Sequence, residues 1–393
     1  MYQWSDLSKN YPASSIRKMA KLAREFDDTI MLTMGEPDFE TPDFIKKAGI
    51  KAIEENRTYY GPNVGEANFQ KAVANKYSKL TGVTFTSNEV MASFGATEGI
   101  LLVMMSVLNK GDDVLIANPH YPNYLGQIMA LGANVVDVPV YEENEFKLQA
   151  ADIEAAITDR TKLLIINSPN NPLGSILERK ELEEILAVAN KHHITILSDE
   201  VYESIIYDGK EHVSLFHLPS AKENHFVVNS FSKTYSMTGW RVGYVVGNTA
   251  AIERMAEFRE GIGFCVPPFI QDAAAEALED DQAIVQEYLE AYNRRRRVII
   301  DGLNKIPGFH CLETAGAFYA FPNIQAFGKS SQDFAMELLT ETHVAMTPGS
   351  AFGTMGEGYL RISFAQAEHK LAEAIERISA YVAVAYPDME KSE

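Results

Sequence analysis

Short apolar runs alternate with amphipathic stretches along much of this 393-residue chain. The spacing of apolar positions predicts helices over 43–55, 66–80, 98–108 and 179–192. Apolar runs of strand length lie between and after them, at Val114–Ala117, Val135–Val140, Leu163–Ile166, Ile194–Leu197, Phe226–Val228 and Val242–Val246. Continuous apolar strands separated by helices are typical of an α/β fold with a mostly parallel central sheet, flanked by helices on both faces.

The C-terminal third of the chain has a different pattern. Its predicted elements are a long helix over 282–305, apolar segments at 316–321 and 359–364, and a last helix over 368–386. This order indicates a smaller α+β domain that is entered through a connecting helix. We therefore expect a large domain of residues 45–285 and a small domain made from 1–44 together with 286–393.

Composition and charge narrow the class of protein. A net charge of −19 argues against nucleic acid or an anionic membrane as a partner. Cys265 and Cys311 are too few for a disulfide framework, which favours the cytoplasm. The N-terminal stretch lacks the apolar core of a signal peptide, and no apolar run reaches the roughly 20 residues of a membrane span. We interpret the Arg294–Arg297 run as a solvated, salt-bridged helix face.

Two polar clusters follow predicted strands, where ligands sit in α/β sheets. Asp199 directly follows a strand in ITILSDEVY, and Tyr202 comes three residues later. A carboxylate there is partly desolvated and needs a cationic partner, unless it is a plain helix N-cap. Lys233 follows another strand in FVVNSFSKTYSMTGWR, with Ser230 before it and Arg241 after it. A semi-buried lysine can form a Schiff base, and the other two groups suit a phosphate. The alternative is a surface lysine in a Ser/Thr loop.

Four weaker signals lie elsewhere. Amides around Ala96 and Thr97, where a glycine-bearing turn enters a helix, form an anion site or an ordinary turn. Asn171 in NSPNNPLGS lies in a functional loop or a surface turn. Tyr121 stacks on a flat ring or packs in the core. Arg361, inside the apolar strand GYLRISFA, needs an anionic partner, either a side chain or a ligand.

Together these motifs resemble the fold-type I, class I aminotransferases, the aspartate and aromatic aminotransferase family that depends on pyridoxal 5'-phosphate (PLP). SFSKTYSMTGWRVGY is similar to the PLP-lysine signature of that family. The motifs follow the family's order from GEPDF at 35–39 to YLRISFA at 359–365. The resemblance therefore covers nearly the whole chain.

The resemblance implies roles for these residues. Lys233 forms the Schiff base and later shuttles the proton, Asp199 pairs with the pyridinium nitrogen, and Tyr202 and Asn171 hold the phenolic oxygen. The phosphate lies among the Ala96 and Thr97 amides, Ser230 and Arg241, and Tyr121 stacks on the ring. Tyr60 reaches the phosphate in the neighbouring subunit of a homodimer. Arg361 binds the substrate α-carboxylate with help from Gly35 and Asn171, and no metal is expected.

The implied reaction moves the amino group of an aromatic, apolar or acidic L-amino acid to a 2-oxo acid such as 2-oxoglutarate, by a ping-pong mechanism. No second arginine can be assigned to a substrate side-chain carboxylate. The stretch around Tyr11–Ile16 is instead expected to cover the pocket with apolar surface. A cysteine-conjugate β-lyase and a racemase or decarboxylase keep the same fold, and a non-catalytic ligand-sensing domain is a further alternative.

Overall fold

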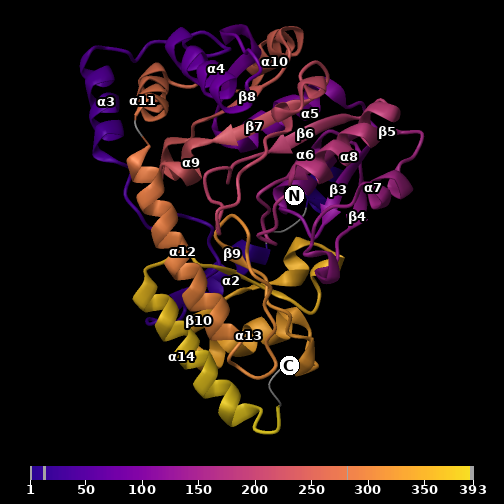
Figure 1. Cartoon of the computed structure of the whole chain (residues 1–393), viewed down its shortest axis with the longest axis vertical. Coiled ribbons are helices and arrows are strands. Elements are labelled where there is room, and N and C mark those ends of the chain that lie inside the picture. The colour runs from indigo at the N-terminus through magenta and orange to yellow at the C-terminus, as the bar shows by residue number, and fades with distance from the viewer. Residues whose placement is uncertain (1, 12–14, 281, 390–393) are drawn as a thin grey trace.

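The computed structural model describes residues 2–11, 15–280 and 282–389 of the chain. A seven-stranded sheet fills the upper part of the molecule in Figure 1, and its strand order is β2-β8-β7-β6-β5-β3-β4. Its strands are β2 (Val90–Ser93), β3 (Asp113–Asn118), β4 (Asn134–Pro139), β5 (Thr161–Asn167), β6 (Thr195–Asp199), β7 (Phe226–Ser230) and β8 (Gly243–Val246). Strand β8 is antiparallel to β2 and β7, and the other neighbours are parallel. The predicted α/β fold with a mostly parallel sheet is confirmed.

Apolar side chains cover both faces of this sheet. In β5, Leu163 and Ile165 pack in one core, and Leu164 and Ile166 pack in another on the opposite face. The first core includes residues of α5 (Gly95–Val107), α6 (Asn123–Ala130) and α10 (Thr249–Ile262). The second includes residues of α4 (Ala67–Thr81), α8 (Arg179–Lys191) and α11 (Pro268–Glu279). Burial on both faces explains why the strands read as continuous apolar runs.

A third apolar core lies in the lower part of Figure 1, around α12 (Ala283–Leu303), α13 (Ser331–Thr342) and α14 (Glu368–Ala385). Strands β1 (Ile30–Met31) and β10 (Val344–Ala345) pair in parallel, and β11 (Thr347–Pro348), β12 (Leu360–Ser363) and β9 (Tyr319–Ala320) form an antiparallel sheet. The β1–β10 pair joins the N-terminal segment to C-terminal elements, as a small domain built from both ends requires. The boundaries at 44/45 and 285/286 stay predictions.

Shorter elements complete the chain. The remaining α-helices are α1 (Asp6–Asn10), α2 (Ser15–Ala23), α3 (Asp43–Glu54), α7 (Ala150–Ala156) and α9 (Phe231–Thr234). The 3-10 helices are Ser87–Glu89, Glu142–Asn144, Leu215–His217, Pro219–Ala221, Thr238–Trp240, Gln325–Phe327, Gly349–Phe352 and Thr354–Gly356. Within the described ranges, no helix combines the length and the apolar character that crossing a bilayer requires.

The interpretation of the Arg294–Arg297 run as a solvated face is wrong for its two central residues. Arg295 and Arg296 are buried, and Arg296 is fully enclosed. Arg295 forms an ion pair with Asp38 at 2.7 Å, and Arg296 pairs with Asp208 at 2.7 Å. A helix turns by about 100° per residue, so a run of four charges cannot all face water once the helix packs on both sides. These pairs tie α12 to the loops on which Asp38 and Asp208 lie.

Candidate active site

A cavity of about 550 Å³ lies at the carboxyl ends of β5, β6 and β7. This is the edge where ligands bind in open α/β sheets. Eleven of the twelve residues predicted for the site line the cavity. They are Gly35, Ala96, Thr97, Tyr121, Asn171, Asp199, Tyr202, Ser230, Lys233, Arg241 and Arg361. The structure thus gathers residues from distant parts of the chain into one pocket.

Tyr60 is the predicted residue that does not line this cavity. Its side chain is 83% exposed and stacks on Phe264, with ring centroids 5.1 Å apart. Its role toward a neighbouring subunit stays a prediction, because the structure contains one chain.

Lys233 belongs to α9, a single helical turn directly after β7. The Ser230 hydroxyl caps this turn by accepting a hydrogen bond from the Ser232 amide. The Lys233 Nζ atom donates a 2.6 Å hydrogen bond to the Gly35 carbonyl oxygen. Removal from water lowers the pKa of Lys233 to about 8, and the positive charges of Arg241 and Arg361 act in the same direction. A lysine in this state supplies a neutral, nucleophilic amine near neutral pH more readily than a surface lysine.

Asp199 is the last residue of β6, and its side chain is buried. Removal from water raises the pKa of Asp199 to about 6. Hydrogen bonds from the Tyr124 hydroxyl, at 2.7 Å, and from the Val201 amide, at 3.3 Å, act against this rise. Asp199 is therefore mostly ionised at neutral pH, and a cation placed against it would favour the charged form further.

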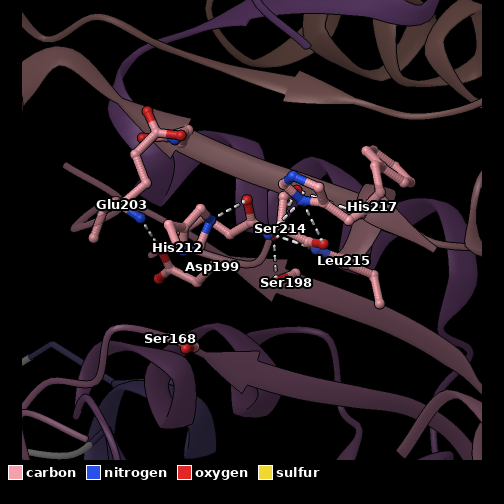
Figure 2. Close-up of polar contacts among 12 residues, drawn as sticks. Ser168, Ser198, Asp199, Glu203, His212, Ser214, Leu215 and His217 are labelled. Carbon is pink, nitrogen blue, oxygen red and sulfur yellow. Dashed lines mark hydrogen bonds and ion pairs between the residues drawn. The ribbon is translucent and has the colours of Figure 1, made fainter. Parts of the chain in front are cut away.

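A second buried carboxylate follows at Glu200, and its hydrogen bonds brace the segment after β6. Its donors are the hydroxyls of Ser198 and Ser214, the amide of Leu215 and the ring of His212. Figure 2 shows these groups beside Asp199, with Glu203 nearby. Glu200, Glu203 and His212 are close enough together to hold a metal ion. The Lys76 ammonium already pairs with Glu203, however, and the carboxylate oxygens of Glu200 already accept hydrogen bonds from protein groups. We therefore assign the cluster a structural role.

Arg361 projects from β12 and is 2% exposed. It donates to Asn171 Oδ1 at 3.1 Å and to the Thr33 carbonyl oxygen. The Arg361 Nε atom has no hydrogen-bond partner, and Arg361 forms no ion pair with any carboxylate in the described part of the chain. Removal from water lowers the pKa of Arg361. A buried guanidinium with neutral partners is a receptor for an anion, and a carboxylate matches its two-pronged geometry.

A glycine-bearing turn lies where β2 enters α5, and Arg241 lies beside it. Ala96 and Thr97 lie in the first turn of α5, where backbone amides lack helical partners. Arg241 Nη2 donates to the Phe94 carbonyl oxygen at 3.2 Å, which holds the guanidinium beside this turn. Gly95 has φ +72°, and a Cβ atom there would lie 2.7 Å from Arg241 Nη2. Glycine is therefore needed for both the backbone conformation and the approach of Arg241.

The cavity residues fit PLP in their chemistry. The amides, Ser230 and Arg241 are phosphate donors, and Lys233 is an amine for the aldehyde. Asp199, whose pKa burial has raised, suits a pyridinium nitrogen. Tyr121 supplies an aromatic ring at the cavity wall.

Sequence reasoning missed several cavity residues. Tyr124 lies three residues after Tyr121, but only the structure shows its hydrogen bond to Asp199. The Oδ1 atom of Asn167 accepts a 2.8 Å hydrogen bond from the backbone amide of Asn171. Arg17 of α2 also lines the cavity and is a candidate for the second arginine that the sequence did not assign. The apolar cover expected around Tyr11–Ile16 falls partly on residues 12–14, which are outside the described residues.

Comparison with known proteins agrees with this geometry. Residues 27–378 match the model of a family described as Aminotransferase class I and II. The chain belongs to this family. Among its relatives, an aspartate aminotransferase of Pyrococcus abyssi is 42% identical, and the match covers 93% of this chain and 94% of that protein. An aromatic-amino-acid aminotransferase 2 of Thermococcus litoralis is 40% identical, with 95% and 97% covered.

A solved structure, titled as an aromatic aminotransferase from Pyrococcus horikoshii OT3, has a TM-score of 0.89 and 40% identity. The match covers 94% of this chain and 99% of that one. The predicted family, fold class and amino-acid aminotransferase activity of this class I and II member are confirmed. The names of these relatives give no support to the β-lyase or ligand-sensing alternatives.

Proposed function

We propose that this aminotransferase binds PLP through Lys233 and works by a ping-pong exchange between an L-amino acid and a 2-oxo acid. The carrying observation is that one cavity joins Lys233, whose pKa is lowered, to a buried Asp199 and to a buried Arg361 without a carboxylate partner. When bound, PLP supplies an electron sink for the bonds at the substrate Cα.

The chain's own residues then have distinct tasks. Lys233 would hold the cofactor through its aldehyde, and the free Lys233 amine would accept the proton from the substrate Cα. Asp199 would pair with the protonated ring nitrogen of the cofactor, and Tyr202 and Asn171 would donate hydrogen bonds to its ring oxygen. Arg361 fixes the α-carboxylate so that the Cα proton faces Lys233.

A half-reaction test separates transamination from its alternatives. The PLP form is mixed with single amino acids while the cofactor absorbance is followed. A transaminase should convert one equivalent of amino acid to its 2-oxo acid and then stop until a second 2-oxo acid is added. Continued release of pyruvate and ammonia from a cysteine conjugate, with no 2-oxo acid present, would instead indicate a β-lyase.

Arg17 is proposed to contact the substrate side chain. Named relatives include both an aspartate and an aromatic aminotransferase, so one pocket has to serve charged and apolar side chains. Arg17 lies on α2, lines the cavity and is exposed. A long exposed arginine can pair with a distal carboxylate and can turn its head to water when the substrate is apolar. This avoids the cost of a buried, unpaired charge facing an apolar side chain.

Arg17→Ala should lower kcat/KM for aspartate and glutamate by about 10- to 100-fold, since a charge-assisted hydrogen bond is lost. The value for phenylalanine should change by less than about threefold. The matched control is Lys18→Ala, which removes the same charge from the next residue of α2, outside the cavity lining. Arg361→Leu should reduce kcat/KM for all amino acids alike. Equal losses for aspartate and phenylalanine in Arg17→Ala would contradict the assignment.

A homodimer is also proposed. Tyr59 and Tyr60 are 81% and 83% exposed, and Ile50, Ile53 and Phe264 are exposed as well. Such large apolar side chains favour a partner surface. The resemblance gives Tyr60 the phosphate of the neighbouring cofactor as its partner.

Tyr60→Phe should therefore weaken PLP binding by about three- to tenfold, because one hydroxyl donor is lost. Tyr59→Phe is the matched control and should leave PLP binding unchanged. Equilibrium dialysis measures the affinity, and light scattering should give twice the chain mass. A fully active monomer at assay concentration would exclude the shared site.

The cytoplasm is proposed as the compartment. Cys265 and Cys311 are both buried as free thiols. A reducing environment suits a chain that makes no use of disulfides among its described residues.

A further inference from the structure

Tyr319 lines the cavity and contacts two of its other residues, Tyr202 and Arg361. It belongs to β9, is 1% exposed and lines the pocket. Its hydroxyl is 2.8 Å from the Tyr202 hydroxyl. Its ring lies over the Arg361 guanidinium at 4.7 Å, and Phe352 lies at the same distance from that guanidinium. Tyr319 thus contacts both Tyr202, the proposed donor to the cofactor ring oxygen, and Arg361, the proposed receptor for the substrate carboxylate.

Gly35 allows this position. A Cβ atom at Gly35 would lie 1.8 Å from the Tyr319 hydroxyl oxygen, so a side chain there would displace the tyrosine. The Gly35 carbonyl oxygen in turn accepts the hydrogen bond from Lys233 Nζ. The Tyr319 hydroxyl is therefore packed between the backbone that Lys233 contacts and the hydroxyl of Tyr202.

We propose that Tyr319 is a positioning residue, whose hydroxyl donates to Tyr202 and so directs the Tyr202 proton toward the cofactor ring oxygen. The inference rests on the proposed function, in which Tyr202 donates to that oxygen. A hydroxyl has one proton to donate. If the Tyr202 proton goes to the cofactor, the contact with Tyr319 survives when Tyr319 is the donor. The Tyr319 ring also orients Arg361 by a cation–π contact.

The electrostatic consequence has a definite sign. A hydrogen bond accepted by Tyr202 makes Tyr202 a stronger donor, because linked hydrogen bonds polarise one another. A stronger donor stabilises negative charge on the cofactor ring oxygen. That negative charge is present when the linkage between Lys233 and the cofactor is unprotonated. Tyr319 therefore lowers the pKa of that linkage. The other titratable and charged groups that line the cavity with the two tyrosines are Arg17, Glu36, Tyr121, Tyr124, Asp199, Lys233, Arg241 and Arg361. These groups are unchanged in a variant that removes the Tyr319 hydroxyl alone.

The test is a pH titration of the visible absorbance of the PLP-loaded protein. Tyr319→Phe keeps the ring and removes the hydroxyl, and it should raise the linkage pKa by about half a unit to one unit. Tyr202→Phe should raise it further. The double variant should match Tyr202→Phe, because Tyr319 acts through Tyr202. An unchanged or lower pKa in Tyr319→Phe, or additive shifts in the double variant, would overturn the proposal.

A matched pair of variants separates the ring from the hydroxyl. Phe352→Leu removes the other aromatic contact of Arg361 and should leave the linkage pKa unchanged. It should weaken binding of succinate, an unreactive dicarboxylate, by about three- to tenfold, as should Tyr319→Leu. Tyr319→Phe should bind succinate normally. If wild-type protein forms no cofactor absorbance, the proposed function fails; if it does and Tyr319→Phe gives no shift, this inference alone fails.

Discussion

Replacing Lys233 by alanine should abolish steady-state transamination while PLP still binds without a covalent bond. Lys233 is the one lysine among the described residues that line the cavity, so no other amine there can form the Schiff base or carry the Cα proton. Ala96, Thr97 and Arg241, which we propose bind the phosphate, are unchanged in the variant, so part of the cofactor affinity should remain. Turnover by a coupled assay and PLP binding by dialysis measure the two effects separately.

A small primary amine provides the control for Lys233→Ala. Added methylamine should restore a fraction of the rate, because it can enter the space left by the side chain and accept the proton. Partial rescue shows that the variant is folded and lacks only the amine. Appreciable turnover without any added amine would mean that another lysine carries the cofactor.

Asp199→Asn should retain the cofactor and lose several orders of magnitude in rate. Asp199 is buried with its pKa raised to about 6, and a cationic ring nitrogen beside it would favour its charged form. A neutral amide cannot stabilise the protonated ring, and the electron sink is weakened. Single-turnover absorbance changes with glutamate measure the chemical step directly.

Tyr124→Phe is the graded comparison for Asp199→Asn. It removes the hydrogen bond to Asp199 Oδ2 but keeps the carboxylate. The expected loss is about tenfold, since one hydrogen bond to a charged group is removed. An Asp199→Asn rate within about tenfold of wild type, which is roughly 1.4 kcal/mol in the barrier, would contradict the role of Asp199.

The fold was predictable from sequence because the inner strands of its sheet are buried on both faces. Leu163–Ile166 reads as one apolar run, since alternate side chains enter different cores. Strand β2 was missed because its four residues lead at once into the Gly95 turn. The Arg295 and Arg296 ion pairs were also missed, since their partners Asp38 and Asp208 lie far away in the sequence.

In the candidate site, too, some residues could be predicted from the sequence and others could not. Asp199, Lys233 and Arg361 stand in motifs next to strands, so local pattern and resemblance were enough to find them. Tyr319 and Arg17 lie in segments without such a motif, and they reach the cavity through the packing of β9 and α2. The contact between Tyr202 and Tyr319 joins residues 117 positions apart, which no spacing rule predicts.

Chemical trapping of the cofactor tests the central proposal most directly. The PLP-loaded protein is reduced with borohydride and digested, and the peptide masses are measured. The cofactor mass should lie on the peptide that contains Lys233. Preincubation with glutamate should prevent this labelling, and 2-oxoglutarate should restore it, because the amino group then moves on and off the cofactor. Labelling of a different lysine, or labelling that glutamate does not change, would contradict the account.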